Sequence, residues 1–205
     1  MCSIIGYYGK NLAAPILVKG LEKMEYRGYD SVGVATKSEN KIQVKKGVGK
    51  VIEVNNAIHL DDLPGITGIG HTRWATHGKV TDTNAHPHSS NSGKIAIVHN
   101  GIIENFQELK DGLISDGYNF QSDTDTEIIA NLIQKNFEKT SDIKQTIIDT
   151  VSNLKGHYAF VVIFDDGTLA AARFHEPLIV GVGKNSHYLS SDVLGFIERT
   201  DDAIY

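Results

Sequence analysis

The sequence predicts an α+β fold in which antiparallel sheets and helices occupy separate parts of the chain. Segments with strand-like patterns come in pairs, and three amphipathic helical segments follow one another between residues 104 and 154. A doubly wound parallel sheet would instead need strands and helices that alternate one by one. We therefore expect antiparallel sheets with segregated helices, and the number of elements fits two sheets stacked between helix layers.

The N-terminal half is predicted to contain one helix and five strands. Cys2 to Tyr8 forms the first strand, which ends at Gly9. Ala13 to Met24 has apolar residues at helical spacing, and Pro15 fits its first turn. The next strands flank a polar turn and then a histidine-rich loop: Ser31–Thr36, Lys41–Val48, Ile66–Ala75 and Lys94–Ile103.

The C-terminal half is predicted to contain three helices and then four strands. The helices are Glu104–Ser115, Thr126–Phe137 and Ile143–Leu154. The strands are Tyr158–Phe164, Leu169–Phe174, Leu178–Val182 and Tyr188–Ser190. No linker, repeat or low-complexity run interrupts the 205 residues, so we expect a single domain.

Composition and charge exclude several classes of function. The formal net charge is −5 and no Lys/Arg cluster offsets it, which argues against nucleic acid as a ligand. No apolar stretch is long enough for a signal peptide or a membrane span, so we expect a cytoplasmic protein without a membrane partner. Cys2 is the only cysteine, so no intrachain disulfide can form.

Cys2 is a candidate nucleophile because it directly follows the initiator methionine. Removal of Met1 would leave a thiol and a free α-amine on one residue, and such an amine has a pKa of about 7.7–8.0. An N-terminal amine that serves as the base for its own nucleophile is an established form of covalent catalysis. The alternative is that Cys2 is only a small buried residue of the first strand.

The nine histidines raise the question of a metal site, because five of them lie between residues 71 and 99. The zinc-binding pattern H-E-x-x-H and partner cysteines are absent, so we expect neither a metal nor another cofactor. The sequence has no G-x-S-x-G motif to support a Ser-His-Asp triad. Two Gly-x-Gly-Lys turns lack the spacing of phosphate-binding loops.

Three further segments each allow a structural and a functional interpretation. Asn100-Gly101 after an apolar run is typical of a turn, but the Asn100 amide and the Gly101 N–H could also stabilise an oxyanion. Arg73 could hold a carboxylate or form a surface ion pair. The acidic run from Asp123 to Glu127 is typical of a helix N-terminus, which accounts for most of its acids without a function.

Together these segments resemble a known family over nearly the whole chain. The matching segments are MCSIIGYYG at the start, EYRGYDSVG (25–33), GHTRWATHG (70–78), NAHPH (84–88), VHNGIIEN (98–105) and SDTDTEIIANLI (122–133). They resemble the glutaminase domain of the glutamine–fructose-6-phosphate aminotransferase (isomerising) family, a class II glutamine amidotransferase. The resemblance implies the N-terminal-nucleophile hydrolase fold, a four-layer αββα sandwich of two antiparallel sheets.

The resemblance also implies an activity and a set of site residues. The domain would hydrolyse the side-chain amide of L-glutamine through a Cys2 thioester, and the ammonia would serve to make glucosamine 6-phosphate from fructose 6-phosphate. Cys2 would be the nucleophile, and Asn100 and Gly101 would form the oxyanion hole. Arg73 would hold the α-carboxylate of glutamine, and Asp125 its α-ammonium group. The other residues implied are Trp74 as a gate for ammonia, Thr76 and His77 on a closing loop, Arg27 and Gly28 near Cys2, and His86 toward the sugar phosphate.

The family pattern sets two further expectations. Residues 1–205 would be one glutamine amidotransferase domain cut within its last strand, followed in the full-length homodimer by a sugar isomerase domain. The segment Phe174-His175-Glu176 is bulkier than the small turn expected there, which leaves the shape of that outer loop open. Two alternatives also stay open: a glutamine-sensing module that is idle because Met1 is retained, and a metal-dependent hydrolase that uses the histidines.

Overall fold

The computed structural model describes residues 2–39, 41–74 and 79–205, which form two antiparallel sheets packed face to face. The larger sheet has the strand order β11-β9-β10-β1-β4-β2-β3, and the smaller sheet has the order β5-β6-β7-β8. The strands of the larger sheet are β1 (Ser3–Tyr8), β2 (Ser31–Ser38), β3 (Lys41–Val48), β4 (Thr67–Arg73), β9 (Ile179–Gly183), β10 (Ser186–Ser190) and β11 (Ala203–Ile204). Those of the smaller sheet are β5 (His88–Ser89), β6 (Ile95–Ile103), β7 (Gly156–Phe164) and β8 (Leu169–Phe174).

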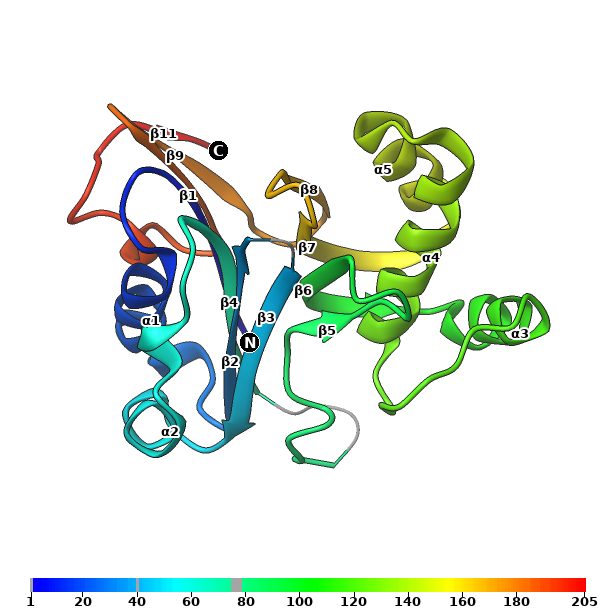
Figure 1. Ribbon diagram of the computed structural model, residues 1–205, viewed down its shortest axis with the longest axis horizontal. Coiled ribbons are helices and arrows are strands. Elements are labelled where there is room, and N and C mark those ends of the chain that lie inside the picture. The colour runs from blue at the N-terminus through cyan, green and yellow to red at the C-terminus, as the bar shows by residue number, and fades with distance from the viewer. Residues whose placement is uncertain (1, 40, 75–78) are drawn as a thin grey trace.

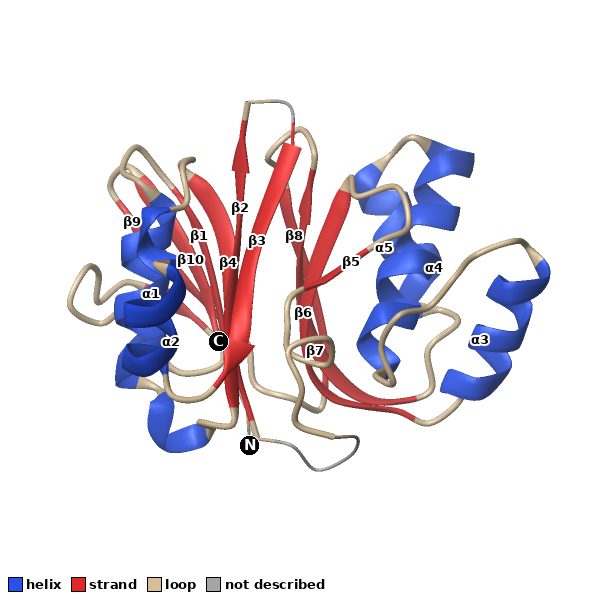
Figure 2. Cartoon of the chain, turned by 60° about the horizontal axis from the view of Figure 1, so that its bottom comes forward, coloured by secondary structure: helices blue, strands red, loops and turns tan. Residues whose placement is uncertain are grey.

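Helices cover the outer face of each sheet, so that the molecule has four layers (Figures 1 and 2). The helices on the larger sheet are α1 (Ala13–Lys23) and α2 (Val51–Ile58). Those beside the smaller sheet are α3 (Phe106–Ser115), α4 (Asp125–Thr140) and α5 (Ile143–Val151). The predicted α+β sandwich of two antiparallel sheets is therefore confirmed. Within the described part of the chain, no helix has the length and apolar content needed to cross a membrane.

Successive side chains along each strand point to opposite faces of the sheet, and this divides the core into layers. On β1, Ile5 and Tyr7 pack against α1, whereas Ile4 points toward the smaller sheet. On β6, Ile95 and Ile97 pack against α4, whereas Ala96 and Val98 meet the larger sheet. Because successive side chains of a strand point to opposite faces, both sheets are buried on both sides, and they carry the long apolar runs seen in the sequence.

Most predicted elements are present, with shifted ends. The helix predicted from Glu104 begins at Phe106, because the Glu104 N–H donates to the Lys155 carbonyl (2.8 Å) and the Asn105 side chain accepts from the Lys155 N–H (2.9 Å). The strand predicted to reach Ala75 ends at Arg73 within the described residues. The short helix α2 and the two-residue strand β5 were not predicted, whereas β11 lies at the end of the sequence, where the family pattern places a last strand.

The fold brings distant parts of the chain together at one edge of the sandwich. Ser3 at the start of β1 pairs with Thr72 near the end of β4, so Cys2 comes close to Trp74. Asn100 reaches the same place from β6 in the other sheet, where its side chain contacts Cys2. The two sheets thus share one site where they meet at this edge.

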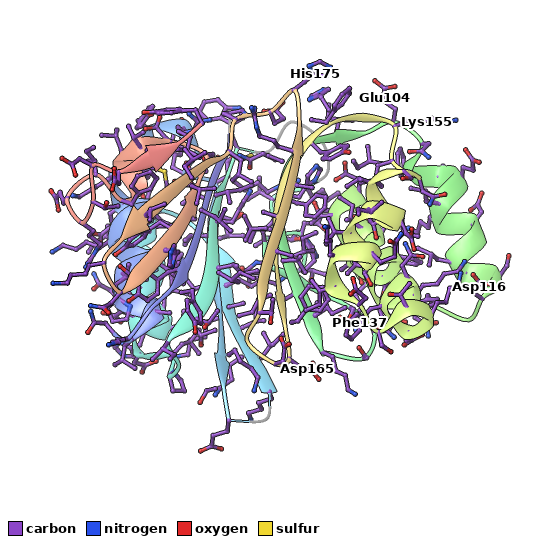
Figure 3. All side chains as sticks on the ribbon, turned by 90° about the horizontal axis from the view of Figure 1, so that it is seen from above. Glu104, Asp116, Phe137, Lys155, Asp165 and His175 are labelled. Atoms are coloured by element: carbon purple, nitrogen blue, oxygen red, sulfur yellow. The ribbon has the colours of Figure 1, made fainter. Side chains whose placement is uncertain are left out.

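The loop from β8 to β9 carries the bulky segment singled out in the sequence. His175 adopts a left-handed conformation (φ 63°), and the Glu176 carboxylate lies 2.8 Å from Nδ1 of His157 on β7. Figure 3 places His175 at the edge of the molecule that also carries Glu104 and Lys155, whereas Asp165 marks the opposite end of the β7–β8 hairpin. The loop is thus anchored to β7 by an ion pair when His157 is protonated.

Candidate active site

A cavity of about 230 Å³ opens where the two sheets meet. It extends from the start of β1 across the end of β6 to the N-terminus of α4. Residues from both sheets, from the N-termini of α3 and α4 and from neighbouring loops line it, among them Cys2, Arg73, Trp74, His86, Asn100, Gly101, Phe106, Asp123 and Asp125. Seven residues of the site predicted from sequence therefore face one space: Cys2, Arg73, Trp74, His86, Asn100, Gly101 and Asp125. Thr76 and His77 lie outside the described residues.

Cys2 is held at the cavity wall through both its thiol and its carbonyl group. The Trp74 N–H donates to Sγ over 3.3 Å, and Sγ lies 3.6 Å from the Trp74 carbonyl oxygen. Arg27 Nε and Asn100 Nδ2 each donate to the Cys2 carbonyl over 3.2 Å. Burial raises the pKa of the Cys2 thiol, against the opposing effects of the Trp74 N–H and the Arg73 charge. A base is therefore needed to produce the thiolate near neutral pH.

Gly28 allows the chain to pack closely around Cys2. A Cβ at this position would lie 2.8 Å from the Arg73 carbonyl carbon and 2.9 Å from the Trp74 nitrogen. Arg27, the preceding residue, is the one that donates to the Cys2 carbonyl. The Trp74 indole packs edge-on against Tyr29, with ring centroids 5.3 Å apart. The segment from Arg27 to Tyr29 therefore supports the strand end that holds the thiol.

Asn100 and Gly101 lie on β6 directly beside Cys2. Asn100 is 5 % exposed, and its amide group lies between Cys2 and His71. Gly101 has a φ of 114°, and a Cβ there would lie 2.1 Å from the His157 carbonyl oxygen. Only glycine fits this backbone conformation and this spacing. The Asn-Gly pair is therefore part of a paired strand, not the simple turn that local sequence allows.

Opposite charges occupy the cavity wall. Arg73 is 6 % exposed at the end of β4, and its Nη1 donates to the Lys79 carbonyl over 3.3 Å. Asp125 is the first residue of α4, and its Oδ2 accepts from the Ile103 N–H over 2.9 Å. The Asp125 side chain is 22 % exposed and turns toward β6. Among the described residues it caps no N–H of its own helix, which weakens the purely structural interpretation of this acid.

Four buried histidines pack at the cavity wall, to which His86 and His99 belong, and behind it. The His71 and His86 rings stack with their centroids 4.1 Å apart, and His86 meets His88 edge-on at 4.9 Å. Burial lowers the pKa of His71 to about 3 and the pKa values of His86 and His88 well below the usual range. Burial also lowers the pKa of His99, although the Asp125 and Glu176 charges oppose the shift. All four rings are therefore neutral near pH 7.

The histidine rings brace the N-terminus of α4 on both sides of Asp125. The Thr124 hydroxyl lies 3.1 Å from His88 Nε2, and the Thr126 hydroxyl lies 3.0 Å from His99 Nδ1 and 3.5 Å from His86 Nε2. The sequence predicts no role for His71, His88, His99 or Thr126, although all four lie within the matching motifs. The sequence signal that could have found the histidines is their concentration between residues 71 and 99.

His86 lies in the interior, where it is 6 % exposed. Its Nδ1 accepts from the His99 N–H over 3.3 Å, and its ring contributes to the cavity wall. Its predicted place toward the sugar phosphate stays a prediction.

Each of the four histidines contacts a protein group through at least one ring nitrogen, whereas His71 Nδ1 and His99 Nε2 have no hydrogen-bond partner among the described residues. In the described parts of the chain, no three His, Cys, Asp or Glu side chains are grouped as metal ligands would be. The ring stacking and the bonds to threonine hydroxyls and backbone atoms account for the buried histidines.

The fold, the near-terminal thiol and the oppositely charged cavity define a glutamine amidotransferase of the N-terminal-nucleophile type. Residues 71–197 match the family described as "Glutamine amidotransferase domain", and the chain belongs to this family. It resembles the solved structure of glutamine phosphoribosylpyrophosphate amidotransferase from B. subtilis, with a TM-score of 0.84 and 29% identity, over 97% of this chain and 44% of that one. That structure shares the α+β fold with two antiparallel sheets.

The chain is also similar to curated relatives over its whole length. The whole chain is 50% identical to glutamine–fructose-6-phosphate aminotransferase (isomerizing) from Pyrococcus horikoshii and 48% identical to that from Aquifex aeolicus. It spans about a third of their length, 35% and 34%. The chain is thus homologous to the amidotransferase region of glutamine–fructose-6-phosphate aminotransferases.

Proposed function

We propose that this domain hydrolyses L-glutamine to glutamate and ammonia through a covalent thioester on Cys2. One observation carries the proposal: the only thiol of the chain, the Asn100 amide and two residues of opposite charge, Arg73 and Asp125, line the same cavity. A free amino acid carries a carboxylate and an ammonium group on one carbon, which Arg73 and Asp125 complement in charge. The side-chain amide of glutamine would then reach Cys2.

The first chemical step is attack of the Cys2 thiolate on the side-chain carbonyl carbon. After removal of Met1, the α-amine of Cys2 takes the thiol proton, which is needed because burial raises the pKa of the thiol. The carbonyl oxygen becomes an oxyanion, which accepts hydrogen bonds from the Asn100 Nδ2 and the Gly101 N–H. The C–N bond breaks as the ammonium group returns its proton to the leaving nitrogen, and ammonia departs.

The second step is hydrolysis of the γ-glutamyl thioester. The α-amine, now neutral, takes a proton from water, and the hydroxide attacks the thioester carbonyl carbon in the same oxyanion hole. The C–S bond breaks, the thiol recovers its proton and glutamate leaves. Every proton is returned, and neither step requires a metal or another cofactor.

The remaining assignments follow the family. Trp74 would gate the ammonia, Thr76 and His77 would lie on a loop that closes over glutamine, and His86 would lie toward the sugar phosphate. We extend the proposal to the full-length protein: a sugar isomerase domain would use the ammonia to make glucosamine 6-phosphate, within a cytoplasmic homodimer. The need for a reduced Cys2 favours that compartment.

The test is glutamate release by the purified chain and by its Cys2→Ala variant. We expect the variant to fold with an unchanged melting temperature and to release no glutamate, because the nucleophile is lost. A glutamine analogue with an electrophilic side chain should label Cys2 once per chain, and intact-mass analysis should show that Met1 is absent from the active protein. Full activity of Cys2→Ala, or labelling of another residue, would disprove the covalent mechanism.

A second measurement tests whether fructose 6-phosphate acts on this domain or on the proposed sugar isomerase domain. Fructose 6-phosphate should leave glutamate release by residues 1–205 unchanged, because the proposed acceptor site lies in the other domain. Stimulation by the sugar would place an acceptor site within this chain.

A further inference from the structure

His71 connects the two sheets beside the proposed oxyanion hole. It lies on β4 of the larger sheet, on the same face as Ile69, which packs into the core between the sheets. Its Nε2 lies 3.0 Å from Oδ1 of Asn100 and 3.1 Å from the His99 carbonyl oxygen, both on β6 of the smaller sheet. His71 is 1 % exposed, so water does not compete for these contacts.

The two contacts together determine where the proton lies on His71. A backbone carbonyl can only accept a hydrogen bond, so Nε2 must carry the hydrogen. No group in the described residues hydrogen-bonds to the buried Nδ1, which fits an unprotonated nitrogen. A second proton on Nδ1 would have no acceptor, and burial lowers the pKa of His71 to about 3. The ring is therefore a neutral donor through Nε2.

A fixed donor on His71 also determines which way the Asn100 amide points. The atom that faces Nε2 must be the amide oxygen, so the amide nitrogen points to the other side, toward Cys2. There Nδ2 donates to the Cys2 carbonyl over 3.2 Å. The reversed amide would bring an N–H against the His71 N–H and an oxygen against the Cys2 carbonyl oxygen, and both contacts are repulsive.

We propose that His71 is a positioning residue that keeps the Asn100 amide nitrogen turned toward Cys2, where it can serve as an oxyanion donor. His71 touches neither glutamine nor the reacting atoms in this mechanism. It acts by satisfying Asn100 Oδ1 so that only one amide orientation is stable. The inference rests on the proposed function, because it assumes that Asn100 stabilises the oxyanion.

The experiment compares His71→Gln with His71→Asn. The terminal amide of glutamine reaches about as far as imidazole Nε2 and can keep a donor near Asn100, whereas that of asparagine ends one atom short. We expect His71→Asn to lower kcat about 10- to 100-fold, less than the roughly 10²- to 10³-fold loss for removal of an oxyanion donor. His71→Gln should recover much of this loss. The KM for glutamine should change little in both variants, because Arg73 and Asp125 are intact.

Two controls separate positioning from general damage to the fold. Ile69→Val alters a buried side chain on the same face of β4 without removing a polar contact, and kcat should stay at the wild-type value. Alkylation of Cys2 by iodoacetamide needs no oxyanion hole, so its rate should be the same in His71→Asn and the wild type. An equal loss of alkylation rate in His71→Asn would show that the thiol itself is displaced, and this would overturn the inference.

A double-mutant cycle with Asn100→Ala gives the decisive comparison. Once the amide is removed, His71→Asn should lower kcat less than twofold further. A multiplicative loss in the double variant would overturn the positioning role. If Asn100→Ala reduces kcat but neither His71 variant does, only the inference about His71 fails. If Asn100→Ala keeps full kcat, the oxyanion hole in the proposed function is wrong.

Discussion

Replacement of Asp125 by asparagine isolates the charge that we assign to recognition of the glutamine α-ammonium. The Asp125 Oδ2 accepts from the Ile103 N–H over 2.9 Å, and the asparagine oxygen can accept the same bond. The substitution therefore keeps the shape and the anchor of the side chain and removes one negative charge. We expect the melting temperature to change little and kcat/KM for glutamine to fall.

The expected decrease in kcat/KM of Asp125→Asn follows from the surroundings of the Asp125 side chain. Two unit charges about 4 Å apart attract by about 4 kcal/mol at an effective dielectric constant near 20. Because the Asp125 side chain is 22 % exposed, solvent screens part of this attraction. We expect a net loss of about 2–3 kcal/mol, which corresponds to a roughly 30- to 150-fold lower kcat/KM.

The assay measures release of ammonia from glutamine and from its analogue 4-carbamoylbutanoate, which lacks the α-amino group. The wild type should prefer glutamine strongly, and Asp125→Asn should lose most of this preference. Asp123→Asn is the matched control, because Asp123 lines the same cavity but is engaged with Asn84, whose Nδ2 donates to it over 3.3 Å. This control should keep most of the preference.

Two results would refute the assignment. If Asp125→Asn discriminates between the two substrates as well as the wild type does, the ammonium group binds elsewhere. If the melting temperature falls together with activity on both substrates, Asp125 is only a structural residue of the α4 N-terminus.

Two other predictions follow from the buried charges and rings. The free energy of unfolding should fall as the pH drops below about 6.5. The fold lowers the pKa values of four buried histidines, His71, His86, His88 and His99, so the unfolded chain binds more protons than the folded one. Each histidine lowers the free energy of unfolding by up to about 1.4 kcal/mol per pH unit. Urea unfolding between pH 7 and pH 5 measures this free energy, and substitution of the exposed His187 by asparagine is the control. A free energy of unfolding that stays constant over this pH range would contradict the prediction. Arg73→Ala should raise the KM for glutamine and cost about 2–5 kcal/mol in kcat/KM; an unchanged kcat/KM would show that another group holds the carboxylate.

The pattern of elements was predictable where it depends on local periodicity. The paired strands and the three consecutive helices led to the correct class of fold, because alternation and helical spacing record which face of an element is buried. The short helix α2 escaped prediction, since eight residues with two adjacent asparagines carry little signal. The N–H of Lys50 there donates to the Glu53 carboxylate over 3.3 Å, a local contact that supports the helix start.

By itself, the sequence determined the family and the candidate residues of the site, because short motifs such as GHTRWATHG and VHNGIIEN preserve the order of the chemical groups. Only the tertiary structure decided how these groups meet. Cys2 and Asn100 are 98 residues apart and come into contact because two sheets pack face to face. The Ile103 N–H anchors Asp125, and His71 orients the Asn100 amide. Local sequence patterns do not predict the positions of the backbone and ring atoms on which these contacts depend. Burial then removes competing water from these contacts, so the packed structure sets which hydrogen bonds form.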